Sequence, residues 1–549
     1  MMSMLGKIFR KRPIPASPIS IVSPQHPRNI SITCHRKPIG YEELYQYTNG
    51  RFLVDESFQL KRRQVMFDVS KLCDIAASAG KSSSPIVAID KFEGGFSKAL
   101  LMKKEDGTEL IAKIPCPHAG LLHDTTASEV AVLQYVQDYT TIPVPKVFAW
   151  SSDPSNPVGC EYIIMEKAAG THLFKIWDDM NESSHLELIK GLTKLECQLA
   201  SLKFPASGHL YLRQSVKDKT KRKVFSSALD PSGSYCIGRS CDRAWLTETN
   251  AELATSESYQ GPWTSVSAYG IALAKREISR ISNTPRSTSC IPHYGTVREQ
   301  VCLLETAISL LHEIEASDIL KNLHMGNIYV SDMEPARISS IIDWQSISVS
   351  PLFLQAGWPI FLKPPKGYIT GLRKPTLPDG FETLSSDDKE IATYQWKQAT
   401  WSKAYEVSSY LNNTEAHNAM NAPRVFRELF LRCGSTWEEG VIPLRACLIE
   451  ISQSWKTLDM PGDCPYIFEN DEIKKHKTES KEYNMWQKVQ EFAREYLGTD
   501  AEGWISPEEN FEEKLEQNRT LFQVLVAQMT GQKSREELRD MWPFSNHLS

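Results

Sequence analysis

The sequence lacks the features that mark several large classes of protein. Its 12 cysteines include no Cys-x-x-Cys pair, so neither a zinc set nor a disulfide framework is indicated. No apolar run is long enough to cross a bilayer as a helix. Positive charge is not in excess, with 62 Lys+Arg against 67 Asp+Glu, which argues against a nucleic-acid-binding protein. What remains is an ordinary globular composition, with the thiols in a reducing compartment.

The first 41 residues differ from the rest because they carry basic charge and no acid. The first acidic residue is Glu42, and apolar residues recur at helical spacing until Pro13 ends the pattern. The apolar positions are Met1, Met4, Leu5, Ile8 and Phe9, and Lys7, Arg10 and Lys11 lie on the opposite side. Such a start is typical of a mitochondrial presequence, and it predicts a mitochondrial location. A disordered basic tail is the alternative. We interpret residues 1–40 as a presequence and a flexible linker.

The rest of the chain is predicted to form a small β-rich lobe followed by a large helical lobe. We expect strands over 86–91, 98–103, 109–114, 147–150 and 162–165, and a helix over 125–138. With a helical extension over 53–79, they make an N-terminal lobe that spans residues 41–165. From about residue 170 the pattern is helical, including a capping box at 184–187, a helix over 298–315, and loops near 456–482 and 500–508. The C-terminal lobe is placed at 166–549.

The first candidate for chemistry is the three-strand meander that carries Lys113. Gly94 and Gly95 in its first turn would let backbone N–H groups approach phosphates closely, because glycine has no Cβ. Lys113 on the third strand would point at the same phosphates, and Glu129 on the following helix is the natural carboxylate to hold it. Taken alone, the glycine pair is equally an ordinary hairpin turn, and Lys113 an exposed strand residue.

The second candidate is a predicted hairpin of two short apolar strands over 328–330 and 338–342. Asn327 precedes the first strand and Asp343 follows the second, so antiparallel pairing brings the two residues to one end. An amide oxygen and a carboxylate that converge there can ligate Mg²⁺, which prefers oxygen ligands. The alternative is a capping Asn and a turn Asp, which are common at strand ends.

Taken together, these motifs resemble the aminoglycoside phosphotransferase family, which is related to the protein kinases. The resemblance rests on Leu323-His324-Met325-Gly326-Asn327 followed by Ile342-Asp343-Trp344, preceded by the glycine turn, by Ile111-Ala112-Lys113 and by the hinge-like Met165-Glu166-Lys167-Ala168. Tyr41 to Phe52 and Gly261-Pro262-Trp263 are similar to a fungal branch called altered inheritance of mitochondria protein nine. The resemblance covers about residues 41–365 well and the C-terminal helices loosely.

The resemblance implies an α+β, two-lobed, protein-kinase-like fold with ATP and Mg²⁺ as cofactors. Gly94, Gly95 and Ser97 would cover the phosphates, Lys113 paired with Glu129 would hold them, and the backbone at Glu166 to Ala168 would meet the adenine. Asn327 and Asp343 fall on the family's two magnesium ligands, within a catalytic-loop segment at 318–345. The acceptor would be an unidentified small molecule or protein. No nucleic-acid partner and no membrane span are expected, and the oligomeric state is left open.

One position departs from the family pattern, His-x-Asp-Leu-His-x-Gly-Asn. Leu320 stands at the first His position, and Asn322 stands where the family has its catalytic Asp. An amide can accept a hydrogen bond from a substrate hydroxyl but cannot take its proton, and losing a general base typically costs about 10²–10⁴-fold in rate. Either the chain is a pseudokinase that acts as a binding or assembly module, or it lacks a short His-x-Asp segment before Leu323, for instance through a displaced splice boundary.

Overall fold

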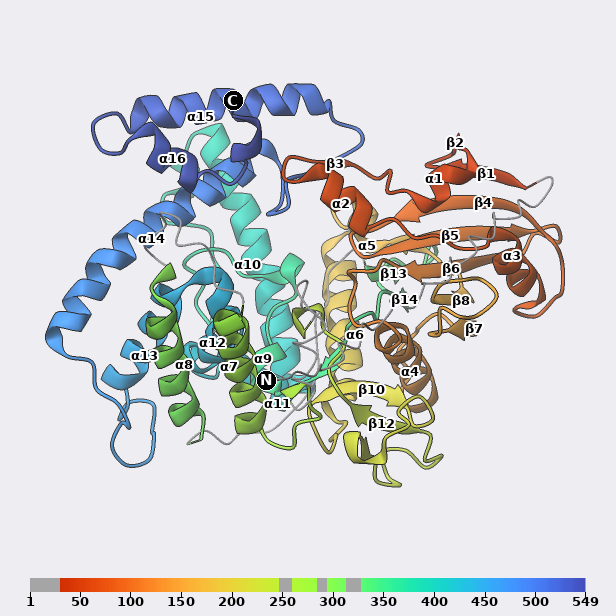
Figure 1. Ribbon diagram of the computed structural model, residues 1–549, viewed down its shortest axis with the longest axis horizontal. Coiled ribbons are helices and arrows are strands. Elements are labelled where there is room, and N and C mark those ends of the chain that lie inside the picture. The colour runs from red at the N-terminus through yellow and green to blue at the C-terminus, as the bar shows by residue number, and fades with distance from the viewer. Residues whose placement is uncertain (1–29, 246–258, 284–293, 313–326, 549) are drawn as a thin grey trace, which may run out of the picture.

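A computed structural model describes residues 30–245, 259–283, 294–312 and 327–548 in two lobes (Figure 1). A small lobe built on a β-sheet lies on the right of the view, and a larger, mainly helical lobe lies on the left. The predicted α+β class, with a β-rich N-terminal lobe and a helical C-terminal lobe, is confirmed. Within the described residues, no helix is both long and apolar enough to span a membrane.

The N-terminal lobe is built on a sheet that, in the described part of the chain, has the strand order β2-β1-β4-β5-β6-β8-β7. The predicted meander is present, and all its neighbouring strands pair antiparallel. Burial alternates along β5, as a sheet with one face on the core requires. The strands are β4 (Ile86–Glu93), β5 (Ser97–Lys104), β6 (Glu109–Pro115), β7 (Val147–Ser151) and β8 (Tyr162–Glu166).

The edge of this sheet corrects the prediction that residues up to 40 are a linker outside the fold. β1 (Ser31–Cys34) pairs parallel with β4, and β2 (Lys37–Pro38) pairs antiparallel with β1. Ile32 and Cys34 are buried, and Thr33 Oγ1 donates a hydrogen bond to Asp90 Oδ1 at 2.6 Å. The prediction was wrong here because Pro and Ser over 13–38 dominate the composition and obscure one four-residue alternating strand.

α1 (Tyr41–Tyr45) and α3 (Val69–Ser78) share a core with this sheet, α4 (Asp124–Tyr139) packs on β7 and β8, and α2 (Glu56–Arg62) contacts β3 (Arg51–Phe52). α4 differs from an ordinary surface helix because nearly every residue from Thr125 to Val136 is buried. One side of it packs on the sheet, around Val130. The other side packs on β10, around Val132 and Tyr135. A helix that is covered on both sides cannot turn or slide without moving a second layer of structure.

That second layer is a sheet which the sequence analysis missed, since residues beyond 170 were expected to be helical. Its strands, in the order β11-β12-β10-β15, are β11 (Lys223–Val224), β12 (Tyr235–Gly238), β10 (Gly208–Leu212) and β15 (Ser348–Val349). β10 lies beneath α4 in the view (Figure 1). These strands are only two to five residues long, and β15 lies far from the other three in the chain, so no local periodicity predicts the sheet.

The predicted hairpin after residue 327 is present as β13 (Ile328–Val330) and β14 (Ile338–Ile341). β9 (Thr171–His172) pairs antiparallel with β13 and forms the third strand of this small sheet. The helical lobe around it is large. Its helices are α5 (Leu173–Ile176), α6 (Glu182–Ala200), α7 (Val266–Asn283), α8 (Val297–Leu311), α9 (Leu352–Gln355), α10 (Ser386–Asn412), α11 (Thr414–Met420), α12 (Arg424–Glu439), α13 (Val441–Gln453), α14 (Asn470–Leu497), α15 (Phe511–Gln528) and α16 (Arg535–Met541).

Two local predictions in this lobe were wrong. α6 begins at Glu182, and Asn181 caps it by accepting a hydrogen bond from the Ser184 N–H, so the capping box expected at 184–187 is not the helix start. Asn181 is as good an N-cap as Ser, and the sequence offers both. Residues 470–482, expected to be loop, form the first half of α14, whose polar composition resembles that of a loop.

The C-terminal segment returns to the N-terminal lobe. β16 (Trp504–Ile505) pairs antiparallel with β3 (Arg51–Phe52), and Leu53 lies in a core with α14, α15 and α16. Gly50 has a φ of 125°, and a Cβ there would lie 2.4 Å from Trp504 Nε1, so only glycine permits this approach. The upper left corner of the small lobe in the view, where β3 lies, is thus tied to the last hundred residues of the chain (Figure 1).

Candidate functional site

Three predicted site residues from three separate elements meet in one charged cluster. Lys113 Nζ on β6 lies 2.6 Å from Glu129 Oε1 on α4 and 3.0 Å from Asp343 Oδ1, which follows β14. The side chains of Lys113 and Glu129 are buried, whereas that of Asp343 is 50% exposed. The cluster joins the two lobes, since Asp343 is 230 positions from Lys113. Two carboxylates thus surround one ammonium, and one of them faces solvent.

The electrostatics of the cluster keep Lys113 charged. Burial alone lowers the pKa of Lys113, but attraction to Glu129 and Asp343 outweighs it and raises this pKa above the usual value. Burial raises the pKa of Glu129, and Lys113 only partly offsets that shift while Asp343 adds repulsion. With both carboxylates ionised the cluster carries one net negative charge, which suits the binding of a further cation at its exposed side.

The predicted pair at the end of the hairpin is brought together by the strand register. Ile328 pairs with Ile341, and the Ile342 N–H donates to the Asn327 carbonyl at 2.9 Å, so Asn327 lies opposite Ile342 and next to Asp343. Asp343 has a φ of 61°, in the left-handed region that Asp adopts more readily than most residues. This sharp turn directly after β14 lets the Asp343 side chain reach Lys113.

The glycine turn lies between β4 and β5, as expected. The Gly94 N–H donates to the Ser97 carbonyl at 3.0 Å and closes the turn. Neither glycine has the positive φ that would require glycine, and a Cβ at Gly95 would meet no atom within 4 Å. The turn itself therefore does not need glycine at position 95. The missing side chain leaves open space there, which is what close approach of a phosphate would use.

Beneath this turn lies a buried charged network that the sequence analysis missed. The Glu93 carboxylate accepts hydrogen bonds from Thr48 N at 2.8 Å and Thr48 Oγ1 at 3.0 Å, and it pairs with the buried ammonium groups of Lys91 and Lys98. Asn49 Nδ2 donates to the Glu93 carbonyl at 2.8 Å. Charged residues at inward-facing strand positions were the signal that could have found it. One carboxylate between two ammonium groups leaves a net positive charge behind the turn.

The C-terminal segment completes this network. Trp504 Nε1 donates to the Asn49 carbonyl at 2.9 Å and to the Tyr47 hydroxyl at 3.0 Å. The residues that hold Glu93 are therefore themselves held from the far end of the chain. Nothing in the spacing of residues 41–52 or 500–508 indicates that these segments meet, because a pairing of two-residue strands leaves no periodic pattern.

The hinge expected at 166–168 connects the two lobes. The Glu166 N–H already donates to the Lys146 carbonyl at 2.9 Å, and Lys167 forms an ion pair with Glu109. Ala168 is half-buried and follows in the same connection. At Gly170, with a φ of 92°, a Cβ would lie 2.0 Å from the Val330 carbonyl oxygen, so the chain passes directly over β13. The hinge and the candidate magnesium pair are thereby held on one small sheet, β14-β13-β9.

Asn322, the position expected for the catalytic base, lies outside the described residues, as do Leu320 and His324. The same holds for residues 1–29, which include the amphipathic start of the expected presequence.

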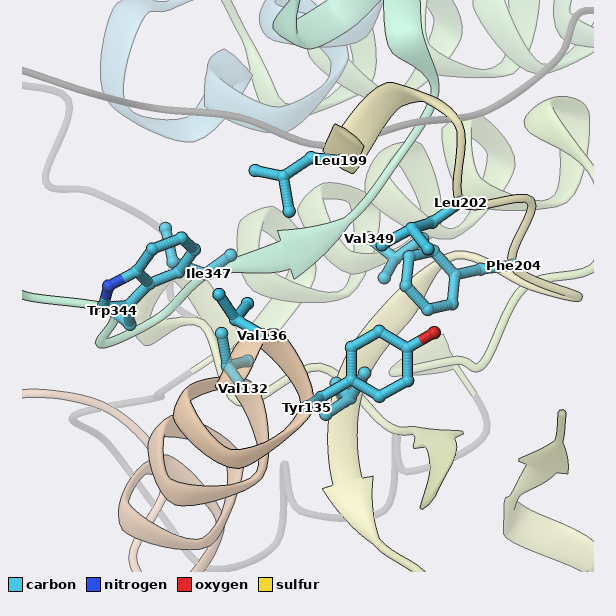
Figure 2. A pocket seen from close by; sticks show the side chains of 10 residues that line it. Val132, Tyr135, Val136, Leu199, Leu202, Phe204, Trp344, Ile347 and Val349 are labelled. Carbon is cyan, nitrogen blue, oxygen red and sulfur yellow. The ribbon is translucent and has the colours of Figure 1, made fainter. Parts of the chain in front are cut away.

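A small apolar cavity lies behind the Asp343 loop (Figure 2). Val132 and Val136 of α4, Trp344 and Ile347 of the loop, and Phe204 line it together with other apolar side chains. It has room for little more than a water molecule and offers almost no polar surface, so it is a packing defect and not a ligand site. Its position shows that Trp344 anchors the loop by apolar packing against the helix that carries Glu129.

Comparison with known proteins identifies sequence relatives over most of the chain. The subtelomeric hrmA-associated cluster protein of Aspergillus fumigatus is 28% identical over 500 residues, which cover 83% of this chain and 96% of the relative. Altered inheritance of mitochondria protein 9 of Yarrowia lipolytica is 22% identical over 515 residues, 86% of each chain. The Saccharomyces cerevisiae protein of that name is 22% identical over 449 residues, 74% of this chain and 70% of the relative. The chain is a relative of altered inheritance of mitochondria protein 9.

The resemblance inferred from the motifs is thereby confirmed, and so is the mitochondrial location, since these yeast relatives are named as mitochondrial. No protein-family model matches the chain. Among solved structures, the chain is similar to ADP-bound aminoglycoside phosphotransferase APH(2″)-Ib, with a TM-score of 0.34, 9% identity, and coverage of 69% of this chain and 95% of that one. The streptomycin–ATP complex of APH(2″)-IIa gives a TM-score of 0.34 and 10% identity, covering 71% and 97%.

The link from Trp504 to the glycine turn predicts a specific change in local opening. Replacing Trp504→Phe keeps an aromatic ring but removes the donor to Asn49 and Tyr47. A lost hydrogen bond of about 1 kcal/mol should speed amide hydrogen exchange of the 93–97 turn roughly fivefold, with less effect on the β5–β6 ladder. Trp455→Phe is the matched control, because Trp455 Nε1 donates to the Gly462 carbonyl in the helical lobe. Equal exchange in the two variants would show that the C-terminal segment does not hold the turn.

A buried histidine behind the Asp343 loop predicts an acid-sensitive stability. His209 on β10 pairs in register with Ser348 of β15, and its Nδ1 accepts a hydrogen bond from the Cys241 N–H at 3.3 Å. Burial, partly opposed by Asp242, lowers the pKa of His209 to about 4 from 6.5. The unfolded chain then binds more protons between these values, so the histidine's contribution is complete above pH 6.5 and is lost as pH falls towards about 4.

We expect this loss to reach at most roughly 3 kcal/mol in the free energy of unfolding. Urea unfolding across this pH range, in the native chain and in His209→Gln, measures it. His118 has its pKa lowered in the same direction and by the same cause, burial, so both proteins should lose stability in acid. The native chain should lose it more steeply, and parallel pH profiles would contradict the assignment to His209.

Proposed function

We propose that the site around Lys113, Glu129 and Asp343, where the two lobes meet, binds a magnesium–ATP complex, and that the chain is a kinase-like phosphotransferase acting on the hydroxyl group of an unidentified small-molecule or protein acceptor. The observation that carries this proposal is the Lys113 ammonium held between Glu129 and Asp343. A lysine paired to a helix carboxylate, beside a carboxylate that faces solvent, is the arrangement that phosphoryl transfer in kinases requires. The kinase-like lobe order and the fungal relatives support it.

The groups present would fit a magnesium ion that binds together with a nucleotide. Asn327 and Asp343 offer an amide and a carboxylate at the same end of the β13–β14 hairpin, and the Asp343 side chain is half exposed. Among the described residues, no group of three or more His, Cys, Asp and Glu side chains could hold a metal ion. Mg²⁺ beside a nucleotide is typically held by one or two protein oxygens, with phosphates and water as its other ligands. Two protein ligands are consistent with that pattern.

The protein's own residues would act mainly by positioning and by charge. When bound, Mg-ATP supplies the phosphoryl group, and the metal neutralises the charge that develops on it. Lys113 would hold the phosphates, and the backbone from Gly94 to Ser97 would cover them, with the net positive charge around Glu93 behind the turn. The connection from Glu166 to Ala168 would meet the adenine with backbone groups other than the Glu166 N–H.

Asn322 favours a second candidate function. An asparagine at the base position cannot take the proton of the attacking hydroxyl and leaves it to water, so turnover would be slow even with every binding group in place. On that basis the chain would be a pseudokinase, a nucleotide-binding module in mitochondrial maintenance. For both candidate functions we propose that residues 1–29 are a mitochondrial presequence and that the boundary between the two lobes lies near residue 165.

A thermal-shift measurement tests whether the chain binds nucleotide at this site. Mg-ATP should raise the melting temperature of the native chain, because a ligand at about 100 times its Kd stabilises by about 2.7 kcal/mol. Lys113→Met and Asp343→Asn should each abolish that shift, whatever they do to the melting temperature without ligand. Lys71→Met is the control, since its ion pair with Asp74 on α3 lies in the same lobe but is exposed and outside the proposed site. A shift that persists in both site variants would contradict the site.

A variant at position 322 tests whether the chain is an active phosphotransferase or a pseudokinase. If only the base is missing, Asn322→Asp should raise phosphoryl transfer to water or acceptor by about 10²-fold or more, with ATP affinity unchanged. Product formation is measured beside the double variant Asn322→Asp, Lys113→Met, which should stay at background. Binding without any gain would favour the non-catalytic module. Sequencing the transcript across codons 318–326 establishes independently whether a His-x-Asp segment is missing.

A further inference from the structure

A loop of the C-terminal lobe combines exposed apolar residues with unopposed positive charge. Residues 363–374, here called the basic loop, follow a short turn at 360–362 and lie along α10. No acidic residue occurs between positions 360 and 378, although the whole chain carries a net charge of −5. The loop's four basic residues, all exposed, are Lys363, Lys366, Arg373 and Lys374.

The basic loop is held rigidly, by a buried ion pair on α10. Lys403 Nζ lies 2.6 Å from Glu406 Oε2 and donates to the Ile369 carbonyl at 2.9 Å and to the Gly371 carbonyl at 2.5 Å. Glu406 accepts from the Gly371 N–H at 2.6 Å and from the Tyr368 hydroxyl at 2.5 Å. Both members of the pair are buried, so their charges are satisfied by each other and by the loop backbone.

The side chains that this anchor presents are apolar and point into solvent. Ile369 is 58% exposed and Leu372 is 80% exposed, although the peptide groups between them are fixed by Lys403 and Glu406. A loop that only closed the chain could place polar residues at these positions. Two exposed aliphatic side chains on an ordered backbone, with basic residues on both sides, suit shallow insertion into the headgroup region of a bilayer.

The acidic residues at the start of α10 lie far from Lys403, which anchors the basic loop. The acids at the start of the helix, Asp387, Asp388 and Glu390, precede Lys403 by 13 to 16 residues, or about 20–24 Å along the axis at the usual rise of a helix. Salt screens charges over about 8 Å under physiological conditions, so these carboxylates do not cancel the field at Ile369 and Leu372. The basic loop is therefore a local concentration of positive charge, followed in the chain by Asp379 and Glu382, on a protein whose net charge is −5.

We infer that the basic loop docks the protein on an anionic phospholipid bilayer, with Ile369 and Leu372 in the interface and the four cations against lipid phosphates. The four cations, with no acidic residue between positions 360 and 378, fit a surface that carries dense negative charge. Charge complementarity commits the site to anionic lipid over neutral lipid. The inference does not depend on whether the proposed site binds ATP.

Co-sedimentation with vesicles tests the inference on the full chain. The protein should bind phosphatidylcholine vesicles that contain phosphatidylglycerol, should not bind pure phosphatidylcholine, and should be released by salt. Lys366→Gln, Arg373→Gln and Lys374→Gln combined should lower binding to the anionic vesicles about tenfold or more. Ile369→Ser with Leu372→Ser should lower it as well, and none of these exposed changes should shift the melting temperature.

Two control variants match these changes elsewhere on the surface. Lys217→Gln, Lys219→Gln and Lys223→Gln combined remove three exposed cations from the segment before and within β11. Ile467→Ser removes an aliphatic side chain that is 85% exposed and lies between Asp463 and Glu469. Both controls should bind anionic vesicles like the native chain. Equal binding to neutral and anionic vesicles, no binding to either, or an equal loss in the controls would overturn the inference.

Discussion

The arrangement of the two lobes depends on one ammonium group and the two carboxylates that hold it. Lys113, Glu129 and Asp343 come from a strand, a helix and a loop of the other lobe, and the two ion pairs are 2.6 and 3.0 Å long. Burying such charges is unfavourable unless each finds its partner, and removing one member of a buried pair costs about 3–5 kcal/mol. This cost applies to the buried Lys113–Glu129 pair, so movement of α4 away from β6 is strongly opposed, whereas solvent weakens the pair with the half-exposed Asp343.

The second constraint is that the supports of this cluster are far apart in the chain. α4 is fixed from below by the β10 sheet, where the Tyr135 hydroxyl donates to Leu229 and that of Tyr235 to Asp138. The glycine turn is fixed from behind by Glu93, and through Asn49 by Trp504. A site whose walls are set before a ligand arrives loses little conformational entropy on binding. The β10 sheet and the C-terminal segment thus support the candidate site, although neither supplies one of its charged side chains.

An element of the fold could be predicted from the sequence when its periodic pattern lies within one segment of the chain. The meander, α4 and the β13–β14 hairpin were predicted because period-two and period-3.6 patterns lie within single segments, and from these elements the meeting of Lys113 with Glu129 followed. β1, the strands of the β10 sheet and β16 were not predicted, since each is only two to five residues long. Their stability comes from tertiary packing, which leaves no periodicity in a single sequence.

The same distinction bears on the asparagine at position 322. Binding of a metal–nucleotide complex would draw on Asn327 and on Lys113, Glu129 and Asp343. The last three also hold the lobes together, so losing any of these three would damage the fold as well as the site. Proton transfer would draw on a single side chain, whose replacement by an amide of the same shape leaves those contacts intact. Binding is thus coupled to stability in this architecture, whereas the chemical step is not. A chain of this design can lose its catalytic base and keep the rest of the constellation, because the two depend on different residues.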